Sequence, residues 1–168
     1  MTESIFNEKE MIELQNLLRA HNKTITSAES CTGGLVASMI TEISGSSDIF
    51  NGSIVTYSNE IKNQELKVEK DTLDKYGAVS TQVVEEMLTG VIKKFKADYA
   101  IAISGIAGPN GGTKNKPVGT VVIGVMRKNI GQDIEICHFE GTRKIVQIQA
   151  AKHSLKKVFK FFQKTLDK

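Results

Sequence analysis

One segment of the chain places two hydroxyls and a thiol side by side: Ser27-Ala28-Glu29-Ser30-Cys31-Thr32-Gly33-Gly34. It follows an apolar β-type run over 24–28 and precedes apolar residues with helical spacing over 35–43. A strand-to-helix turn of this kind directs backbone N–H groups and the helix dipole at a ligand. A nucleophile there lies beside donors for a developing oxyanion. The structural alternative is that Ser30 or Thr32 caps the helix while the glycines allow close packing.

Two further segments are predicted to end strands at the same edge of a sheet. The first, Tyr57 to Lys62, follows an expected strand over 50–57. The second, Ser104 to Thr113, follows a buried apolar strand over 99–103, and with its continuation to residue 120 it holds five of the chain's 14 glycines and both prolines. Long glycine-rich loops beyond strand ends often bind ligands. This loop matches neither a Walker motif nor a dinucleotide fingerprint, and a wide surface loop is the alternative.

The rest of the sequence alternates helical and strand patterns. Helices are expected over 7–20, 35–43, 58–66, 80–95 and 143–168, and strands over 24–28, 50–57, 99–103, 118–126 and 134–139. The last two strands are joined near residues 129–131 as a predicted hairpin. This order predicts an α/β fold, a three-layer α/β/α sandwich with a mixed β-sheet, in one domain spanning residues 1–168.

Composition narrows the class of protein. The chain has 168 residues, of which 40% are hydrophobic and 24% charged, as in globular proteins. No run is long enough to span a membrane, and the first residues lack a signal-peptide pattern, so a cytoplasmic location is expected. The two cysteines, Cys31 and Cys137, follow no metal-binding or disulfide spacing. Neither a metal nor a cofactor is therefore expected.

Charge is distributed unevenly along the chain. The net charge is +3, but residues 143–168 alone carry +7 and the remainder −4. In this last predicted helix, lysines at 152, 156, 160 and 164 lie opposite an apolar stripe. A solvated lysine face is the favoured interpretation, because a nucleic-acid site would interleave arginines and aromatic residues with the lysines. Nucleic acid is not expected as a partner.

The motifs resemble those of the CinA C-terminal domain family, whose stand-alone members are nicotinamide-nucleotide amidohydrolases of the PncC type. Five segments carry the resemblance, which is highly specific in order and spacing and covers nearly the whole chain: Ala28-Glu29-Ser30-Cys31-Thr32-Gly33-Gly34, Thr56-Tyr57-Ser58-Asn59-Glu60, Gly77-Ala78-Val79-Ser80, Ser104-Gly105-Ile106-Ala107-Gly108-Pro109 and Lys116-Pro117-Val118-Gly119-Thr120.

The resemblance implies hydrolysis of nicotinamide mononucleotide to nicotinate mononucleotide and ammonia, in a homodimer or higher homo-oligomer. It also implies a catalytic serine, lysine and tyrosine, which correspond here to Ser30, Lys62 and Tyr57. The residues predicted to bind the substrate are Cys31, Thr32, Gly33, Gly34, Ser104, Gly105, Gly108, Gly112, Thr113 and Arg143. Of these, Arg143 and the glycine-rich loop are expected to bind the phosphate, although Arg143 has the alternative of being only the first charge of the basic helix.

The chemistry of the residues fits a serine and lysine pair. All three histidines, His21, His138 and His153, lie away from the motif segments, so a lysine is the remaining base. Its pKa must fall from about 10.4, and both burial and a pyridinium ring beside it favour the neutral amine. Tyr57 is expected to relay the proton or to hold Ser30 and Lys62 in register.

Other readings of the sequence stay open. The thiol of Cys31 is a rival nucleophile, but neighbouring side chains diverge, so only one of Ser30 and Cys31 is expected to face the crevice. The main alternative function is a non-catalytic nucleotide-binding or regulatory module linked to competence or DNA damage, in which the loops only hold a phosphate. An amidase for another small amide is a third possibility.

Overall fold

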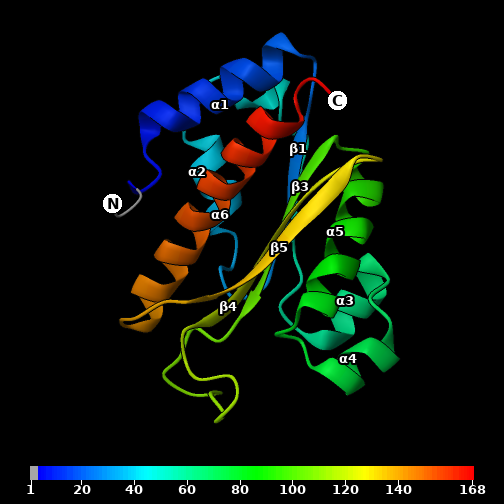
Figure 1. Ribbon diagram of the computed structural model, residues 1–168, viewed down its shortest axis with the longest axis vertical. Coiled ribbons are helices and arrows are strands. Elements are labelled where there is room, and N and C mark those ends of the chain that lie inside the picture. The colour runs from blue at the N-terminus through cyan, green and yellow to red at the C-terminus, as the bar shows by residue number, and fades with distance from the viewer. Residues whose placement is uncertain (1–3) are drawn as a thin grey trace.

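The computed structural model describes residues 4–168, which form a five-stranded mixed sheet between two layers of helices (Figure 1). The predicted domain also includes residues 1–3, which lie outside the described residues. The strand order is β2-β1-β3-β4-β5. The strands are β1 (Ile25–Glu29), β2 (Ile54–Val55), β3 (Tyr99–Gly105), β4 (Thr120–Arg127) and β5 (Gly131–His138). This arrangement confirms the predicted three-layer α/β/α architecture.

Strand direction explains why the motif segments meet. Strands β2 and β3 both pair with β1 in parallel, whereas β4 and β5 continue the sheet antiparallel. The carboxyl ends of the three parallel strands therefore lie at one edge of the sheet. From that edge β1 leads into Ser30, β2 into Tyr57, and β3 into the glycine-rich loop.

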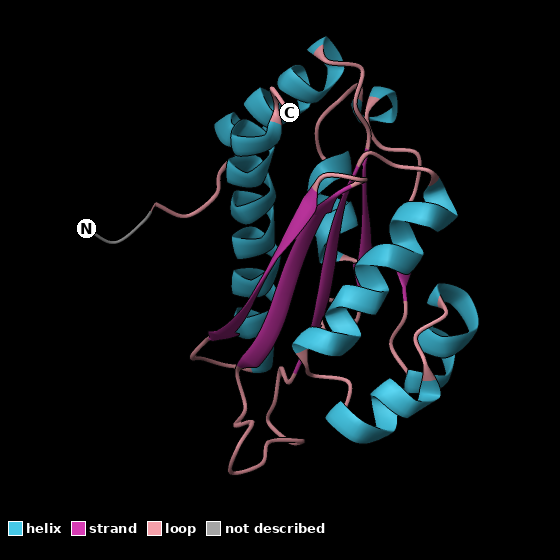
Figure 2. Ribbon diagram, turned by 45° about the vertical axis from the view of Figure 1, so that its right-hand side comes forward, coloured by secondary structure: helices cyan, strands magenta, loops and turns pink. Residues whose placement is uncertain are grey.

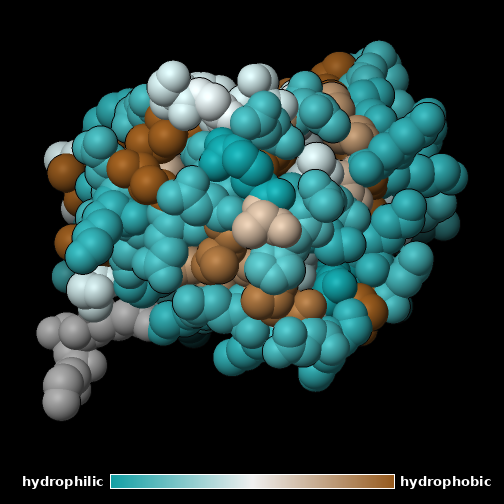
Figure 3. All heavy atoms as spheres, turned by 90° about the horizontal axis from the view of Figure 1, so that it is seen from above, coloured by the Kyte–Doolittle hydropathy of each residue, from teal (hydrophilic) through white to brown (hydrophobic). Residues whose placement is uncertain are grey.

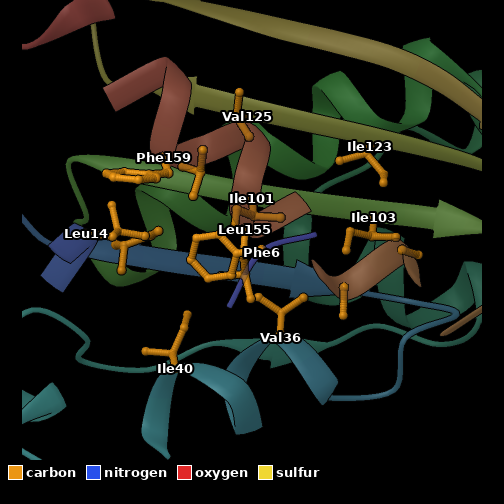
Figure 4. Close-up of a cluster of buried hydrophobic side chains, with 14 of the residues drawn as sticks. Phe6, Leu14, Val36, Ile40, Ile101, Ile103, Ile123, Val125, Leu155 and Phe159 are labelled. Atoms are coloured by element: carbon orange, nitrogen blue, oxygen red, sulfur yellow. The ribbon is translucent and has the colours of Figure 1, made fainter. Parts of the chain in front are cut away.

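Helices cover both faces of the sheet, as the turned view shows (Figure 2). One face carries α1 (Glu8–Ala20), α2 (Leu35–Thr41) and α6 (Arg143–Thr165), and the other carries α3 (Asn59–Leu66), α4 (Lys70–Tyr76) and α5 (Thr81–Phe95). Each face has its own hydrophobic core. Figure 4 shows the larger one, in which Val36 and Ile40 of α2 lie below Ile101 and Ile103 of β3. Buried on both sides, β3 is a nearly continuous apolar run, whereas β1 is equally buried but holds the polar residues Thr26, Ser27 and Glu29.

Local capping agrees with the predicted helix starts. Asn7 caps α1 in a capping box with Glu10, and Ser58, Ser80 and Thr142 accept hydrogen bonds from the first turns of α3, α5 and α6. In the 4–168 region, no helix is long and apolar enough to cross a membrane. The end of the molecule seen in Figure 3 is mostly hydrophilic, with apolar residues in small groups.

The structure corrects two element predictions. The strand expected over 50–57 is reduced to β2, Ile54–Val55. Residues 50–53 instead run beside β1 as irregular chain in which the Gly52 carbonyl accepts a bond from Thr26 Oγ1. Helix α4 was not predicted, because Leu73 is its only buried residue and gives no apolar period. The hairpin joining β4 and β5 is confirmed.

The lysine face of the last helix is only partly solvated. Lys160 and Lys164 are exposed, but Lys156 is largely buried in an ion pair with Glu10 of α1. The basic helix is thus tied to an acidic residue of the first helix.

Candidate active site

A cavity of about 270 Å³ opens at the carboxyl edge of the parallel strands. Four of the five motif segments and the start of α6 line it, whereas the segment from Lys116 to Thr120 does not. The lining residues are Ser30, Cys31, Tyr57, Asn59, Lys62, Ala78, Val79, Ser104, Gly105, Ile106, Ala107, Gly108, Asn110, Gly111 and Arg143. Among the described residues that line it there is no Asp or Glu, and the two basic residues are Lys62 and Arg143.

Ser30 and Lys62 form the polar centre of the cavity. Lys62 Nζ donates to Ser30 Oγ over 3.0 Å, and both side chains are buried. Lys62 comes from the first turn of α3, which Ser58 starts as its cap. Helix α3 is packed tightly on α5, because a Cβ on Gly90 would lie 2.2 Å from the carbonyl oxygen of Leu66. Close helix packing therefore sets where the lysine points.

Burial changes the protonation of Lys62. Its side chain is 1% exposed, and no ion pair with a carboxylate of residues 4–168 compensates its charge. Desolvation by burial lowers the pKa of Lys62 from 10.5 to about 8. An appreciable fraction of the amine is thus neutral near physiological pH, and a neutral amine beside a serine hydroxyl can accept its proton.

The backbone carbonyl and the phenol of Tyr57 contact different parts of the site. Its carbonyl oxygen accepts Lys62 Nζ at 3.3 Å and Ser30 Oγ at 3.4 Å, so the backbone holds the pair in register. The phenol is 59% exposed and accepts a bond from Arg143 NH2 over 2.7 Å. Of the two roles expected for Tyr57, holding Ser30 and Lys62 in register agrees with the contacts of its carbonyl, whereas the phenol turns outward to the arginine and is not placed to relay the proton.

The N-terminus of α2 is occupied by a side chain of the protein. Glu29, fully buried, accepts hydrogen bonds from the backbone N–H groups of Val36 and Ala37. The cap residue is Gly34, which has no side chain to cap the helix. Neither Ser30 nor Thr32 caps the helix. The sequence predicted that the first N–H groups of α2 would face a ligand, but the Glu29 side chain already accepts their hydrogen bonds. The Glu29 side chain instead anchors the turn that follows it.

The nucleophile turn itself leaves backbone donors open. Gly33 and Gly34 have φ values of +60° and +106°, which a residue with a Cβ rarely adopts. The N–H groups of Gly33 and Leu35 bond within the turn, whereas those of Cys31 and Thr32 donate to no backbone carbonyl of residues 4–168. The Cys31 N–H faces the thiol of its own residue. Thr32, Gly33 and Gly34 shape the turn but do not line the cavity.

Cys31 and Ser30 both line the cavity, contrary to the expectation that only one faces it. Their surroundings differ: Ser30 Oγ contacts Lys62, whereas desolvation by burial raises the pKa of the Cys31 thiol to about 12. A thiol that keeps its proton is a poor nucleophile. The contact with the base therefore favours the serine.

Arg143 joins three parts of the site. One guanidinium nitrogen donates to the Gly108 carbonyl over 2.7 Å, and the other to the phenol of Tyr57. One helical turn further along α6, Gln147 Nε2 donates to the Cys31 carbonyl over 2.9 Å. Gln147 was not among the predicted site residues, since an amide within an amphipathic helix carries no sequence signal. The start of α6 thus contacts the three segments that follow β1, β2 and β3.

The predicted phosphate-binding hydroxyls are placed unequally. Ser104 lines the cavity, but its hydroxyl already donates to the Ala78 carbonyl over 2.8 Å. Gly112 and Thr113 lie outside the lining, and Thr113 Oγ1 accepts from the N–H of Lys116 in an exposed turn. Gly105 and Gly108 do line the cavity. Asn59 and Asn110 also line the cavity and were not predicted as site residues, although they lie in the Tyr57–Lys62 segment and the glycine-rich loop that the sequence singled out.

Comparison with known proteins agrees with the motifs. A family model described as CinA C-terminal domain matches residues 7–162. The chain belongs to the CinA C-terminal domain family. A competence damage-inducible protein A of Klebsiella pneumoniae has a similar solved structure, with a TM-score of 0.87 and 32% identity over 90% of this chain and 94% of that one. Its likeness confirms the fold of the family.

The curated relatives fall into two lengths. A nicotinamide-nucleotide amidohydrolase PncC of Enterobacter agglomerans is 47% identical over 91% of this chain and 93% of its own length. A CinA-like protein of Prochlorococcus marinus is 54% identical over 79% of this chain but only 31% of its own length. The chain thus spans about a third of the longer family members that it matches.

Proposed function

We propose that this chain is an amidohydrolase that converts nicotinamide mononucleotide to nicotinate mononucleotide and ammonia. The observation that carries the proposal is the 3.0 Å contact between Lys62 Nζ and Ser30 Oγ in a buried site. The name of the Enterobacter relative, which matches along nearly its full length, supports the same reaction.

Ser30 acts as nucleophile and Lys62 as base. The neutral amine takes the hydroxyl proton while Oγ bonds to the carboxamide carbon, and the resulting ammonium then protonates the departing nitrogen as the C–N bond breaks. Ammonia leaves with that proton and an acyl ester remains on Ser30. Water then attacks the ester carbon and gives one proton to Lys62. As the ester C–O bond breaks, Lys62 returns that proton to Ser30 Oγ, so nicotinate mononucleotide leaves and the serine hydroxyl and neutral amine are restored.

The oxyanion of each tetrahedral intermediate needs backbone donors close to Ser30. The N–H groups of Cys31 and Thr32, which bond to no backbone carbonyl, are the candidates, because the N–H groups at the start of α2 are bonded to Glu29. Arg143 at the cavity mouth is the candidate for the substrate phosphate. Its guanidinium is already fixed by Gly108 and Tyr57, so it loses little freedom on binding.

The contact between Ser30 and Lys62 also helps to distinguish an enzyme from the main alternative, a module that only binds a nucleotide. Convergence of Ser30, Tyr57 and Lys62 within hydrogen-bond reach is the feature expected to separate an enzyme from such a module. Ser30 Oγ and Lys62 Nζ lie within that reach, and Tyr57 joins them through its carbonyl oxygen while its phenol bonds to Arg143. Burying a lysine without a carboxylate costs stability, and its contact with the Ser30 hydroxyl is the one that a catalytic base requires.

Ammonia release measured on a panel of pyridine amides tests the function. The wild-type chain should release ammonia from nicotinamide mononucleotide, and the Ser30→Ala variant should bind the same compound without releasing ammonia. A wild-type chain that binds the mononucleotide but releases no ammonia would support the binding module instead. Faster release from a different amide would assign the site to that substrate.

A further inference from the structure

A carboxylate, a thiol and an imidazole lie together between β5 and α6, outside the cavity. Glu135 and Cys137 stand two residues apart on β5, so both side chains project from the same face of the sheet. His153 of α6 lies across from them, with its Nε2 2.5 Å from Glu135 Oε1. One ligand atom from each of the three residues lies within 4.8 Å of the other two. No spacing rule detects this cluster in the sequence, because the helix supplies its third member.

These three groups are the ligand types that zinc takes in proteins. Thiolate, imidazole and carboxylate bind Zn²⁺ at about 2.0–2.3 Å, and three protein ligands leave a fourth tetrahedral position for water. Ligand atoms already within 4.8 Å of one another need shifts of about 1 Å to reach a common ion at those distances. Side-chain rotation alone supplies shifts of that size, since all three residues are partly exposed.

The local charges are mixed, because Asp133 and Glu135 share a pocket with four lysines, at positions 156, 157, 160 and 164. A thiolate and a carboxylate neutralise Zn²⁺, while the imidazole remains neutral. The Lys157 ammonium lies 3.4 Å from Glu135, but it also lies 3.1 Å from Asp133 and can keep that partner. Burial, and next the Glu135 carboxylate, raise the pKa of the Cys137 thiol to about 12, so the metal-free thiol keeps its proton. A bound metal ion would replace that proton.

We propose that Glu135, Cys137 and His153 form a binding site for Zn²⁺ or a similar borderline-soft divalent ion. The ion would join the edge strand β5 to α6, the helix whose first turns contact the cavity through Arg143 and Gln147. Its role follows from that position: it fixes a strand that is paired on one side only.

Cobalt binding to the full-length, untagged protein tests the site. Co²⁺ bound by a thiolate gives a charge-transfer absorption band in the near ultraviolet, and Zn²⁺ should displace the ion and remove the band. Cys31→Ser is the matched control, since it removes the other cysteine. The band is expected in the wild type and in Cys31→Ser and should be absent in Cys137→Ser. Thermal unfolding should shift upward with added Zn²⁺ in the same two proteins only.

A second variant separates ligand loss from misfolding. His153→Gln leaves the thiol in place and changes one half-exposed residue of α6. It should weaken Zn²⁺ binding by more than the about 10- to 100-fold typical of losing an outer-shell partner. The absence of a thiolate band in the wild type would overturn the proposal. A band that survives in Cys137→Ser, or Zn²⁺ affinity unchanged in His153→Gln, would overturn it as well.

Discussion

Gln147 of α6 donates its side-chain amide to the backbone carbonyl of Cys31 over 2.9 Å. This bond holds the peptide between Cys31 and Thr32 from outside the turn, while Glu29 holds the start of α2 from inside. Gln147 therefore orients the N–H group of Thr32, one of the two that we propose as oxyanion donors. Preorganised donors of this kind stabilise charge in the transition state more than the bound substrate.

Replacing Gln147 by leucine should lower kcat more than it raises KM. The amide touches neither Ser30 nor Lys62, so the loss comes from a looser turn and should be about 10- to 100-fold, below the cost of removing an oxyanion donor outright. Steady-state ammonia release measures it. Gln149→Leu is the matched control, because that amide, two residues along α6, bonds only to the Glu140 carbonyl in an exposed loop. Equal losses in the two variants would show that the effect is a general one on α6.

Ser30 and Lys62 should behave as one catalytic unit. Ser30→Ala and Lys62→Met should each remove most of the ammonia release, and the double variant should be scarcely worse than either, because a nucleophile without its base is inactive. Cys31→Ala should retain most activity, since its thiol keeps its proton. Normal turnover in Ser30→Ala with a dead Cys31→Ala would assign the nucleophile to the thiol.

The sheet and the meeting of the motif segments follow from sequence patterns, whereas the finer contacts do not. Apolar runs and cap residues locate β1, β3, α3 and α5, and strand order brings Ser30 beside Lys62. The role of Glu29 was missed because a residue seven positions before the helix N–H that it binds can reach it only once the turn between them has folded back. The outward phenol of Tyr57 was missed for a similar reason: its partner, Arg143, lies 86 residues away.

Arg143 should discriminate substrates that carry a phosphate. Arg143→Gln should lower kcat/KM for nicotinamide mononucleotide by about 10- to 100-fold, the size of a hydrogen bond to a charged group, and change it little for the riboside, which lacks the phosphate. Lys144→Gln removes the neighbouring exposed charge and serves as control. Equal kcat/KM for free nicotinamide and the mononucleotide in the wild type would exclude phosphate recognition.

Lys62 should cost the protein stability below the pH at which it loses its proton. Its pKa is lowered from 10.5 to about 8, and at about 1.4 kcal/mol for each pKa unit this amounts to about 3 kcal/mol. Because the folded pKa lies below the unfolded one, the cost is complete below pH 8 and disappears as pH rises toward 10.5. Lys62→Met should therefore unfold at a higher temperature than the wild type at neutral pH. A difference in Tm that does not shrink as pH rises would contradict this origin.

The pH dependence of turnover should report Lys62 directly. Neutral Lys62 accepts the proton of Ser30, so activity should rise with pH, and the limb in kcat/KM should lie near 8, the value set by burial in the free enzyme. The substrate carries a positive pyridinium ring next to the carboxamide. That charge disfavours the ammonium form more than the remoter phosphate favours it, since Coulomb energy falls with distance. The apparent pKa in the pH profile of kcat, which reports the enzyme–substrate complex, should therefore be lower than the apparent pKa in the profile of kcat/KM.

Binding to the inactive Ser30→Ala variant isolates the effect of the ring charge. By linkage, a ligand that lowers the pKa of Lys62 binds more tightly as that lysine loses its proton. Nicotinamide mononucleotide should therefore gain affinity as pH rises from about 7 to 9. The reduced mononucleotide, which has the same phosphate but an uncharged ring, should gain less. Equal pH dependence for the two ligands, or a kcat limb at or above that of kcat/KM, would leave burial as the sole cause of the lowered pKa.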